Sequence, residues 1–428
     1  MLVTLILIFI FGYVAIAFEH PIKINKSATA ILTGVLMWTI YILLDHNTTE
    51  INHHLIQHLA EISQILFFLL AAMTIVELMD AHDSFQIITD KIKTTDKRKL
   101  IWIVAILTFF LSAILDNLTT TIVIISLLRR LVQDRKDRLY CVGITVIAAN
   151  AGGAWSPIGD VTTTMLWINN QITTYNIMTG LFFPSIIGLI VPLIVISIKL
   201  KGKLSPTTIE SKTGNTTQWE RNIVFAIGLG ALIFVPIYKT VTHLPPYMGI
   251  LFGLGLMWVV TELIHSAKDD ADKDSLSVLH ALRKIDTASI LFFLGILLSI
   301  ACLESTRLLS TMALWLDKSI GNHSIIIILI GLLSSIIDNV PLVAAAQGMY
   351  SLEQFPTDHY FWIFLAYTAG TGGSCLIIGS AAGVAAMGME KIDFIWFLKK
   401  ISVYAFLGFF AGCIAYMMQY YIIHGQLG

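Results

Sequence analysis

The sequence has few charged residues and few cysteines for its length. Only 13% of its 428 residues are Asp, Glu, Lys or Arg, whereas soluble domains carry about 25%. A soluble chain of this size must cover a large surface with polar groups, so the shortage excludes an ordinary soluble fold. The four cysteines are far apart, which excludes a disulfide framework or a zinc-binding spacing. The net charge of −1 gives no basic surface for nucleic acid.

Hydrophobic residues dominate instead and make up 56% of the chain. They come in runs of about 20 residues, the length that spans a bilayer, separated by short polar loops. The sequence therefore predicts an all-α polytopic membrane protein. The apolar N-terminus up to Phe18 lacks the basic start of a signal peptide, so we expect it to form a first membrane helix.

An internal repeat organises the rest. Residues 111–117 resemble residues 333–339, and both segments end in Asp-Asn. A Gly-Gly pair follows in each copy, and another glycine comes six residues later. These features recur in the same order about 220 residues apart, which predicts two structural repeats.

The repeats predict the domain organisation. The expected parts are an extra N-terminal membrane helix (1–27), repeat 1 (28–200), a cytoplasmic loop with a linker helix (201–245) and repeat 2 (246–428). Each repeat is expected to contain a re-entrant hairpin (100–131 and 322–351) and a broken helix (139–170 and 359–390).

Lysine and arginine predict the orientation. Both flanks of segment 100–131 are basic, and so is the start of repeat 1 at Lys23 and Lys26, so these points should be cytoplasmic. Each half of 100–131 is too short for a crossing of about 20 residues, which favours a hairpin that returns to the same side. The segment 352–359 has no Lys or Arg and should be external. The repeats are then inverted, with ten full crossings, two hairpins and both termini outside.

Asp116 and Asp338 stand at the predicted hairpin tips. An ionisable residue inside the bilayer costs about 2.5–3.5 kcal/mol and usually serves function. Equivalent positions in inverted repeats predict a midplane site that binds ions and protons. The alternative is that the two aspartates cap helices or pair with each other.

Hard oxygen donors accompany the aspartates and suit sodium, and no His/Cys cluster suggests a transition metal. The candidate ion ligands are Asn117, Asn339, Thr120, Asn150, Ser156, Asp160 and Ser374. Threonine hydroxyls in membrane helices commonly bond to their own backbone, which is the alternative for Thr120. A favourable contact with a helix start is the alternative for Asp160.

Helix-breaking residues follow each hairpin. Gly152, Gly153 and Pro157 predict a break in the first copy, and Gly372 and Gly373 predict one in the second, which lacks the proline. Close helix packing is the alternative role of these glycines.

Other titratable residues lie toward predicted membrane ends. Glu77, Asp80 and Glu304 could belong to a proton path or face water. His53, His54 and His58 cluster in a predicted external loop, where a metal or pH-sensing role competes with an ordinary surface role.

At these residues the sequence resembles the NhaD-type sodium/proton antiporters, which belong to an ion-transporter superfamily with arsenite permeases and dicarboxylate carriers. The similarity rests on four stretches: 12–23, Asp116 to Thr121, Asn150 to Thr163, and Asp338 to Pro341. It implies a homodimer with a moving transport domain, a bacterial cytoplasmic membrane, Na⁺ and H⁺ as transported ions, and no cofactor.

The hypothesis from the sequence is that Na⁺, or Li⁺, competes with protons at the midplane aspartates. The nearest rival is an arsenite or other small-solute permease, since a carboxylate carrier would not place aspartates at its site. An intramembrane aspartyl protease and a channel are the rivals from other classes.

Overall fold

The computed structural model describes residues 1–17, 19–45, 47–89, 92, 94–200, 202–203, 216–266, 269 and 274–425. Within these ranges the regular elements are helices, which confirms the predicted all-α class, and one isolated β-bridge joins Asp96 and Lys203. Most of the predicted loop after repeat 1, residues 204–215, lies outside the described part of the chain.

The helices fall in the same order in both halves. The N-terminal part and repeat 1 contain α1 (Leu2–Ala17), α2 (Glu19–Ile22), α3 (Lys26–Asp45), α4 (Thr48–Ala81), α5 (Gln86–Thr89), α6 (Lys97–Leu115), α7 (Asn117–Leu131), α8 (Arg135–Ala154), α9 (Val161–Ile168) and α10 (Thr174–Lys199). The linker is α11 (Gln218–Thr242). Repeat 2 contains α12 (Pro246–Ile264), α14 (Val278–Lys284), α15 (Thr287–Ser305), α16 (Leu308–Ile320), α17 (His323–Leu333), α18 (Asn339–Met349), α19 (Tyr360–Gly372), α20 (Ala381–Glu390), α21 (Phe394–Phe397), a π-turn (Leu398–Ser402) and α22 (Val403–His424).

Eight of the described helices are long and apolar enough to cross a membrane, and the bent pair α16–α17 would make a ninth. By length and composition, α6 counts as a crossing and the two broken helices do not. The first half of one, α8, has 20 residues but a charged start, and the other three halves are short. The ten crossings and the inverted orientation of the repeats therefore stay predictions.

Both predicted hairpin turns occur at the Asp-Asn pairs. Between α6 and α7, Asp116 adopts a positive φ of 86° and its carboxylate accepts a hydrogen bond from the backbone N–H of Thr119. Before α18, the carboxylate of Asp338 accepts one from the N–H of Val340 at 3.3 Å. Both aspartates therefore fill the capping role that was their alternative interpretation, and the helices end and begin at them.

Both predicted helix breaks also occur. The chain leaves helical geometry between α8 and α9, and again between α19 and α20 although no proline is present there. A Cβ atom on Gly152 would overlap the carbonyl oxygen of Phe109, and one on Gly372 would overlap that of Gly331. The glycines thus permit close packing against the hairpins, which is the role held as their alternative.

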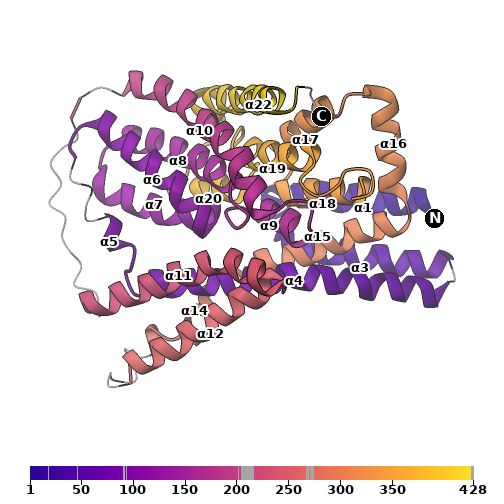
Figure 1. Ribbon diagram of the computed structural model, residues 1–428, viewed down its shortest axis with the longest axis horizontal. Coiled ribbons are helices and arrows are strands. Elements are labelled where there is room, and N and C mark those ends of the chain that lie inside the picture. The colour runs from indigo at the N-terminus through magenta and orange to yellow at the C-terminus, as the bar shows by residue number, and fades with distance from the viewer. Residues whose placement is uncertain are drawn as a thin grey trace.

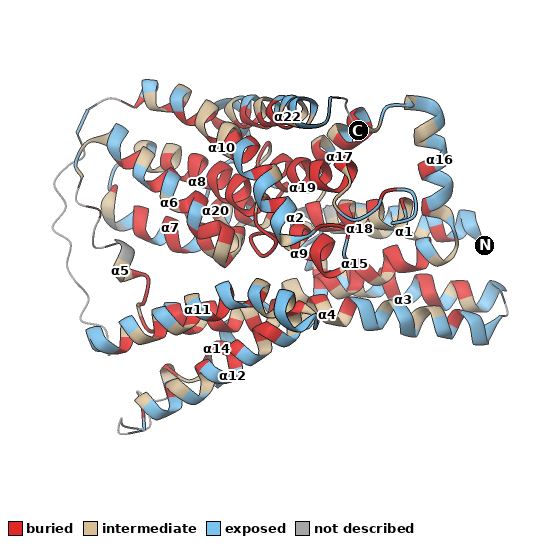
Figure 2. Ribbon diagram, in the orientation of Figure 1, coloured by how far each residue is buried: buried red, intermediate tan, exposed pale blue. Residues whose placement is uncertain are grey.

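The hairpins and broken helices gather in one part of the molecule, above the long helices α3, α4, α11 and α12 in Figure 1. Figure 2 shows that α8 and α19 are buried at the centre of this part, whereas α11 and α12 expose much of their surface. Irregular backbone at membrane depth is stable only where protein or water surrounds it. We call the hairpins and broken helices the core, and α3, α4, α11, α12 and α15 the frame.

Candidate functional site

Asp160 is the most enclosed acidic residue of the core. It precedes α9 at the first helix break and is only 2% exposed. Its Oδ1 accepts hydrogen bonds from the N–H and the hydroxyl of Thr162, both at 2.9 Å. A buried carboxylate needs such donors because desolvation would otherwise favour its neutral form.

The asparagines of both hairpins also bond to Asp160. Asn117 Nδ2 donates to Asp160 Oδ2 at 2.6 Å, and Asn339 Nδ2 lies 3.3 Å from both carboxylate oxygens. These two asparagines begin α7 and α18, which are equivalent helices of the two repeats. The carboxylate therefore joins the two hairpin tips at one point.

A polar chain continues from this point into the second broken helix. Asn117 Nδ2 donates to Asn150 Oδ1 at 3.1 Å, and Asn150 Nδ2 donates to the hydroxyl of Ser380 at 3.0 Å. All these side chains are at least about nine-tenths buried. Amide and hydroxyl oxygens supply the hard donors that an alkali cation requires.

Asp116 and Asp338 flank this cluster. The Asp116 carboxylate accepts hydrogen bonds from the hydroxyl and from the backbone N–H of Thr119, both at 2.8 Å. Asp338 lies 3.8 Å from Lys26 Nζ, and its side chain is 20% exposed. No direct hydrogen bond from either carboxylate to Asp160 is present among the described residues, so the three acids surround the site instead of sharing one contact.

The remaining predicted ligands differ in their placement. The Thr120 hydroxyl is fully buried and has no hydrogen-bond partner among the described residues. Ser156 lies in the first break, where its hydroxyl faces the N–H of Ile158 at 3.4 Å. Ser374 donates to the carbonyl of Thr371 at 2.6 Å within the second break. These three stay candidate ligands and are not hydrogen-bonded to the Asp160 cluster.

The sequence analysis missed Ser380 and Thr162. A signal for Ser380 was present, because it follows Gly373 by seven residues as Asp160 follows Gly153 by seven. The repeat thus pairs an acid in one half with a hydroxyl in the other.

Two cavities follow the boundary between core and frame. A cavity of about 60 Å³ is lined by Asp116, Asn117 and Asp160 on the core side and by Phe68 and Phe293 on the frame side. It is large enough for water or a small ion.

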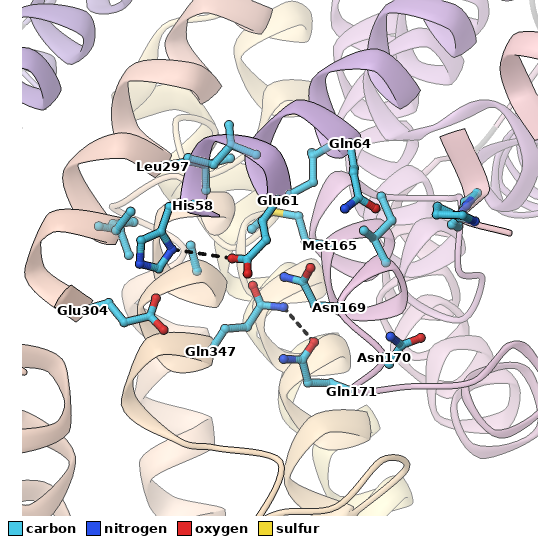
Figure 3. A pocket seen from close by; sticks show the side chains of 18 of the residues that line it. His58, Glu61, Gln64, Met165, Asn169, Asn170, Gln171, Leu297, Glu304 and Gln347 are labelled. Carbon is cyan, nitrogen blue, oxygen red and sulfur yellow. Dashed lines mark hydrogen bonds and ion pairs between the residues drawn. The ribbon is translucent and has the colours of Figure 1, made fainter. Parts of the chain in front are cut away.

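The second cavity, of about 500 Å³, is shown in Figure 3. Its polar lining includes His58, Glu61, Glu304 and Gln347, with His58 Nδ1 lying 3.5 Å from Glu61 Oε2. Ile65 and Met165 line this cavity, and their neighbours Phe68 and Thr164 line the small one, so the two cavities approach each other along α4 and α9.

The three histidines of the predicted external loop lie instead in the first turns of α4. His54 faces Glu50 at 3.8 Å, and His58 faces Glu61. Within the described part of the chain no three His, Cys, Asp or Glu residues could hold a metal ion together.

In this polytopic helical protein, two hairpin tips meet at a buried carboxylate, which is the architecture of a membrane transporter. The chain belongs to the citrate transporter (CitMHS) family, whose model matches residues 13–362. It is 50% identical to sodium/proton antiporter 1 of Arabidopsis thaliana, over 97% of this chain and 72% of that protein. It is 30% identical to the Na⁺/H⁺ antiporter NhaD of Alkalimonas amylolytica, over 95% and 88% of the two chains. The NhaD protein of Vibrio cholerae is 29% identical, over 96% and 91%. These matches confirm the resemblance to NhaD-type proteins and place the chain among transporters, not enzymes.

Proposed function

We propose that this protein exchanges Na⁺ for H⁺ across a membrane, with Li⁺ as an alternative cation. The observation that carries the proposal is the Asp160 carboxylate, buried between the asparagines of both hairpin tips. The names of the Arabidopsis and NhaD relatives support sodium and protons as the pair of ions.

The cluster suits competition between one cation and one proton. A cation beside Asp160 would be held by the carboxylate together with the amide oxygens of Asn117 and Asn339. Each side-chain amide would have to rotate by half a turn, so that its oxygen instead of its NH₂ group faces the cation. A proton on Asp160 would remove the charge that holds the cation. Asp116 and Asp338 add negative charge around the site and are the further residues proposed to bind the ion or the proton.

Access would alternate by movement of the core against the frame. The large cavity beside His58 and Glu304 lies toward the predicted external ends of α4 and α15 and supplies the proposed outer route. Apolar side chains where the two cavities approach each other, Ile65 and Phe68 among them, would close that route while the site faces the other side.

The charge of the site argues against citrate, although the matching family model carries that name. Citrate is a polyanion, and three carboxylates around the site would repel it. An uncharged solute such as arsenite stays the second candidate. A protease is not supported. Its two aspartates would share a proton, whereas Asp116 and Asp338 each cap a helix, and no hydrogen bond joins their carboxyl groups among the described residues.

We propose that the protein lies in the cytoplasmic membrane of a bacterium, with both termini external. We also propose that it functions as a homodimer. The bacterial NhaD relatives support this membrane, while the Arabidopsis relatives show that similar chains also occur in plants.

The test is ion-driven pH change in proteoliposomes with an acidified lumen. NaCl should make the lumen alkaline, and KCl should not. No response to NaCl or LiCl between about pH 6 and 9, from protein shown to be folded, would contradict antiport and favour the other-solute reading.

A further inference from the structure

Lys26 of the frame faces Asp338 of the core. Lys26 is the first residue of α3, which packs against α1 and α15. Asp338 precedes α18 at the tip of the second hairpin. The 3.8 Å between Lys26 Nζ and Asp338 Oδ2 therefore spans the boundary between frame and core.

The local structure aims the Lys26 side chain. The ammonium lies 4.5 Å from the centre of the Phe292 ring, a cation–π distance. The backbone N–H of Lys26 donates to Glu19 Oε1 at 3.2 Å, and the next hydroxyl, of Ser27, donates to the carbonyl of Ala288 at 2.6 Å. These contacts fix the start of α3 against α15, so the lysine extends toward Asp338 from a fixed base.

The ion pair is placed for exchange. The two side chains are 28% and 20% exposed, so water reaches the pair and weakens it. Asp338 is followed by Asn339, whose amide bonds to Asp160. The carboxylate that Lys26 contacts is thus one residue from the cluster proposed to bind sodium.

We propose that the Lys26 ammonium is a tethered cation that competes with the transported cation for Asp338. This inference rests on the proposed function and adds a residue that sets its apparent affinity. While Lys26 pairs with Asp338, one negative charge near the site is neutralised. When a cation binds, or when the core moves away from α3, the carboxylate is released to the site.

The competition predicts the effect of removing the lysine charge. Lys26→Gln should lower the Na⁺ concentration for half-maximal exchange by about two- to fivefold, the upper part of the range expected for one partly exposed ion pair. Lys26→Arg retains the charge and should stay within about twofold of the wild type. Lys23→Gln is the matched control, since Lys23 is exposed three residues away and makes no ion pair among the described residues.

The experiment measures half-saturating Na⁺ and maximal rate separately in proteoliposomes, and the Na⁺-dependent rise in melting temperature of the detergent-solubilised protein. A lower half-saturating Na⁺ and a larger rise at low Na⁺ for Lys26→Gln alone would support the proposal. If Lys26→Gln does not fold, Lys26→Met keeps the packing on Phe292 and gives the same test.

The outcomes separate two failures. If the wild type responds to Na⁺ and the folded Lys26 variants have the same half-saturating concentration, Lys26 has only a structural role and this inference is wrong. If the wild type responds to Na⁺ in neither assay, the proposed function itself fails and the competition fails with it.

Discussion

Replacing Asp160 with Asn removes one negative charge from the cluster and keeps the size of the side chain. The new amide oxygen can still accept from Thr162, as Asp160 Oδ1 does now. The new amide NH₂ would then face Asn117 Nδ2, which lies 2.6 Å from the present Oδ2. Two donors would meet there, and the Asn117 amide must turn to restore a hydrogen bond.

The two consequences differ in size. Loss of one hydrogen bond costs about 1 kcal/mol, and removal of a desolvated charge offsets part of it, so the fold should lose no more than about 1–2 kcal/mol. Loss of the charged ligand should weaken Na⁺ binding by about 3 kcal/mol or more, which corresponds to about 100-fold. Asp160→Asn should therefore fold and fail to exchange at ordinary Na⁺ concentrations.

Sodium-driven alkalinisation of proteoliposomes measures the second effect, and thermal unfolding measures the first. Asp393→Asn is a suitable control, because Asp393 is an exposed aspartate that caps α21 by accepting from the N–H of Trp396. A folded Asp160→Asn protein that exchanges Na⁺ with half-saturation within about threefold of the wild type would refute the placement of the ion at this carboxylate.

Three further substitutions test other parts of the arrangement. Ser380→Ala should raise half-saturating Na⁺ by about fivefold, because it removes the acceptor of two hydrogen bonds, from Asn150 Nδ2 and from the N–H of Gly383, while Ser197→Ala, at a half-buried serine, should leave it unchanged; a Ser380→Ala value equal to that of the wild type would exclude Ser380 from the site. Glu390→Gln leaves two arginines without their carboxylate and should reduce the free energy of unfolding by about 1–2 kcal/mol; an unchanged melting temperature would show that these ion pairs do not stabilise the fold. Gly372→Ala places a methyl group against the carbonyl of Gly331 and should cost about 3 kcal/mol, seen as a large loss of folded protein; normal stability would contradict the close packing.

Local signals made much of the fold predictable. The hairpin turns fall at the Asp-Asn pairs because an aspartate can cap a helix at membrane depth, and this signal lies within a few residues. The breaks fall after the Gly-Gly pairs for a similarly local reason. Repetition of both signals in one order located them even in the second copy, where the proline is missing.

The site depends on contacts that no local pattern contains. Asp160 and Asn339 are 179 residues apart, and only packing of the two repeats brings them together. The sequence therefore drew attention to Asp116 and Asp338, which lie in conspicuous apolar surroundings, and left Asp160 with two open interpretations. Lys26 shows the same limit: charge counting uses it as a marker of orientation, whereas the structure places its ammonium beside Asp338.

Two polar contacts between the repeats indicate how the core can move. At one end, Glu390, the last residue of α20, accepts from Arg129 Nε at 2.6 Å and from Arg138 Nε at 2.9 Å. At the other end, Asp358 before α19 accepts from the N–H of Thr173 at 2.6 Å, and Asp358 holds a positive φ of 65° to do so.

In each contact, residues next to the connection that follows one hairpin bind the end of the broken helix of the other repeat. Because the two contacts lie at equivalent positions of the two repeats, a hinge between the repeats would have to break at least one of them. The site between Asp160 and Asn339 spans the same boundary and would be pulled apart by such a hinge. Movement of the whole core against the frame leaves all three contacts intact. Among the described polar contacts, it would break the partly exposed Lys26–Asp338 pair and the hydrogen bond from Lys239 of α11 to the carbonyl of Trp167. Alternating access by displacement of an undivided core is therefore the motion that this set of contacts favours.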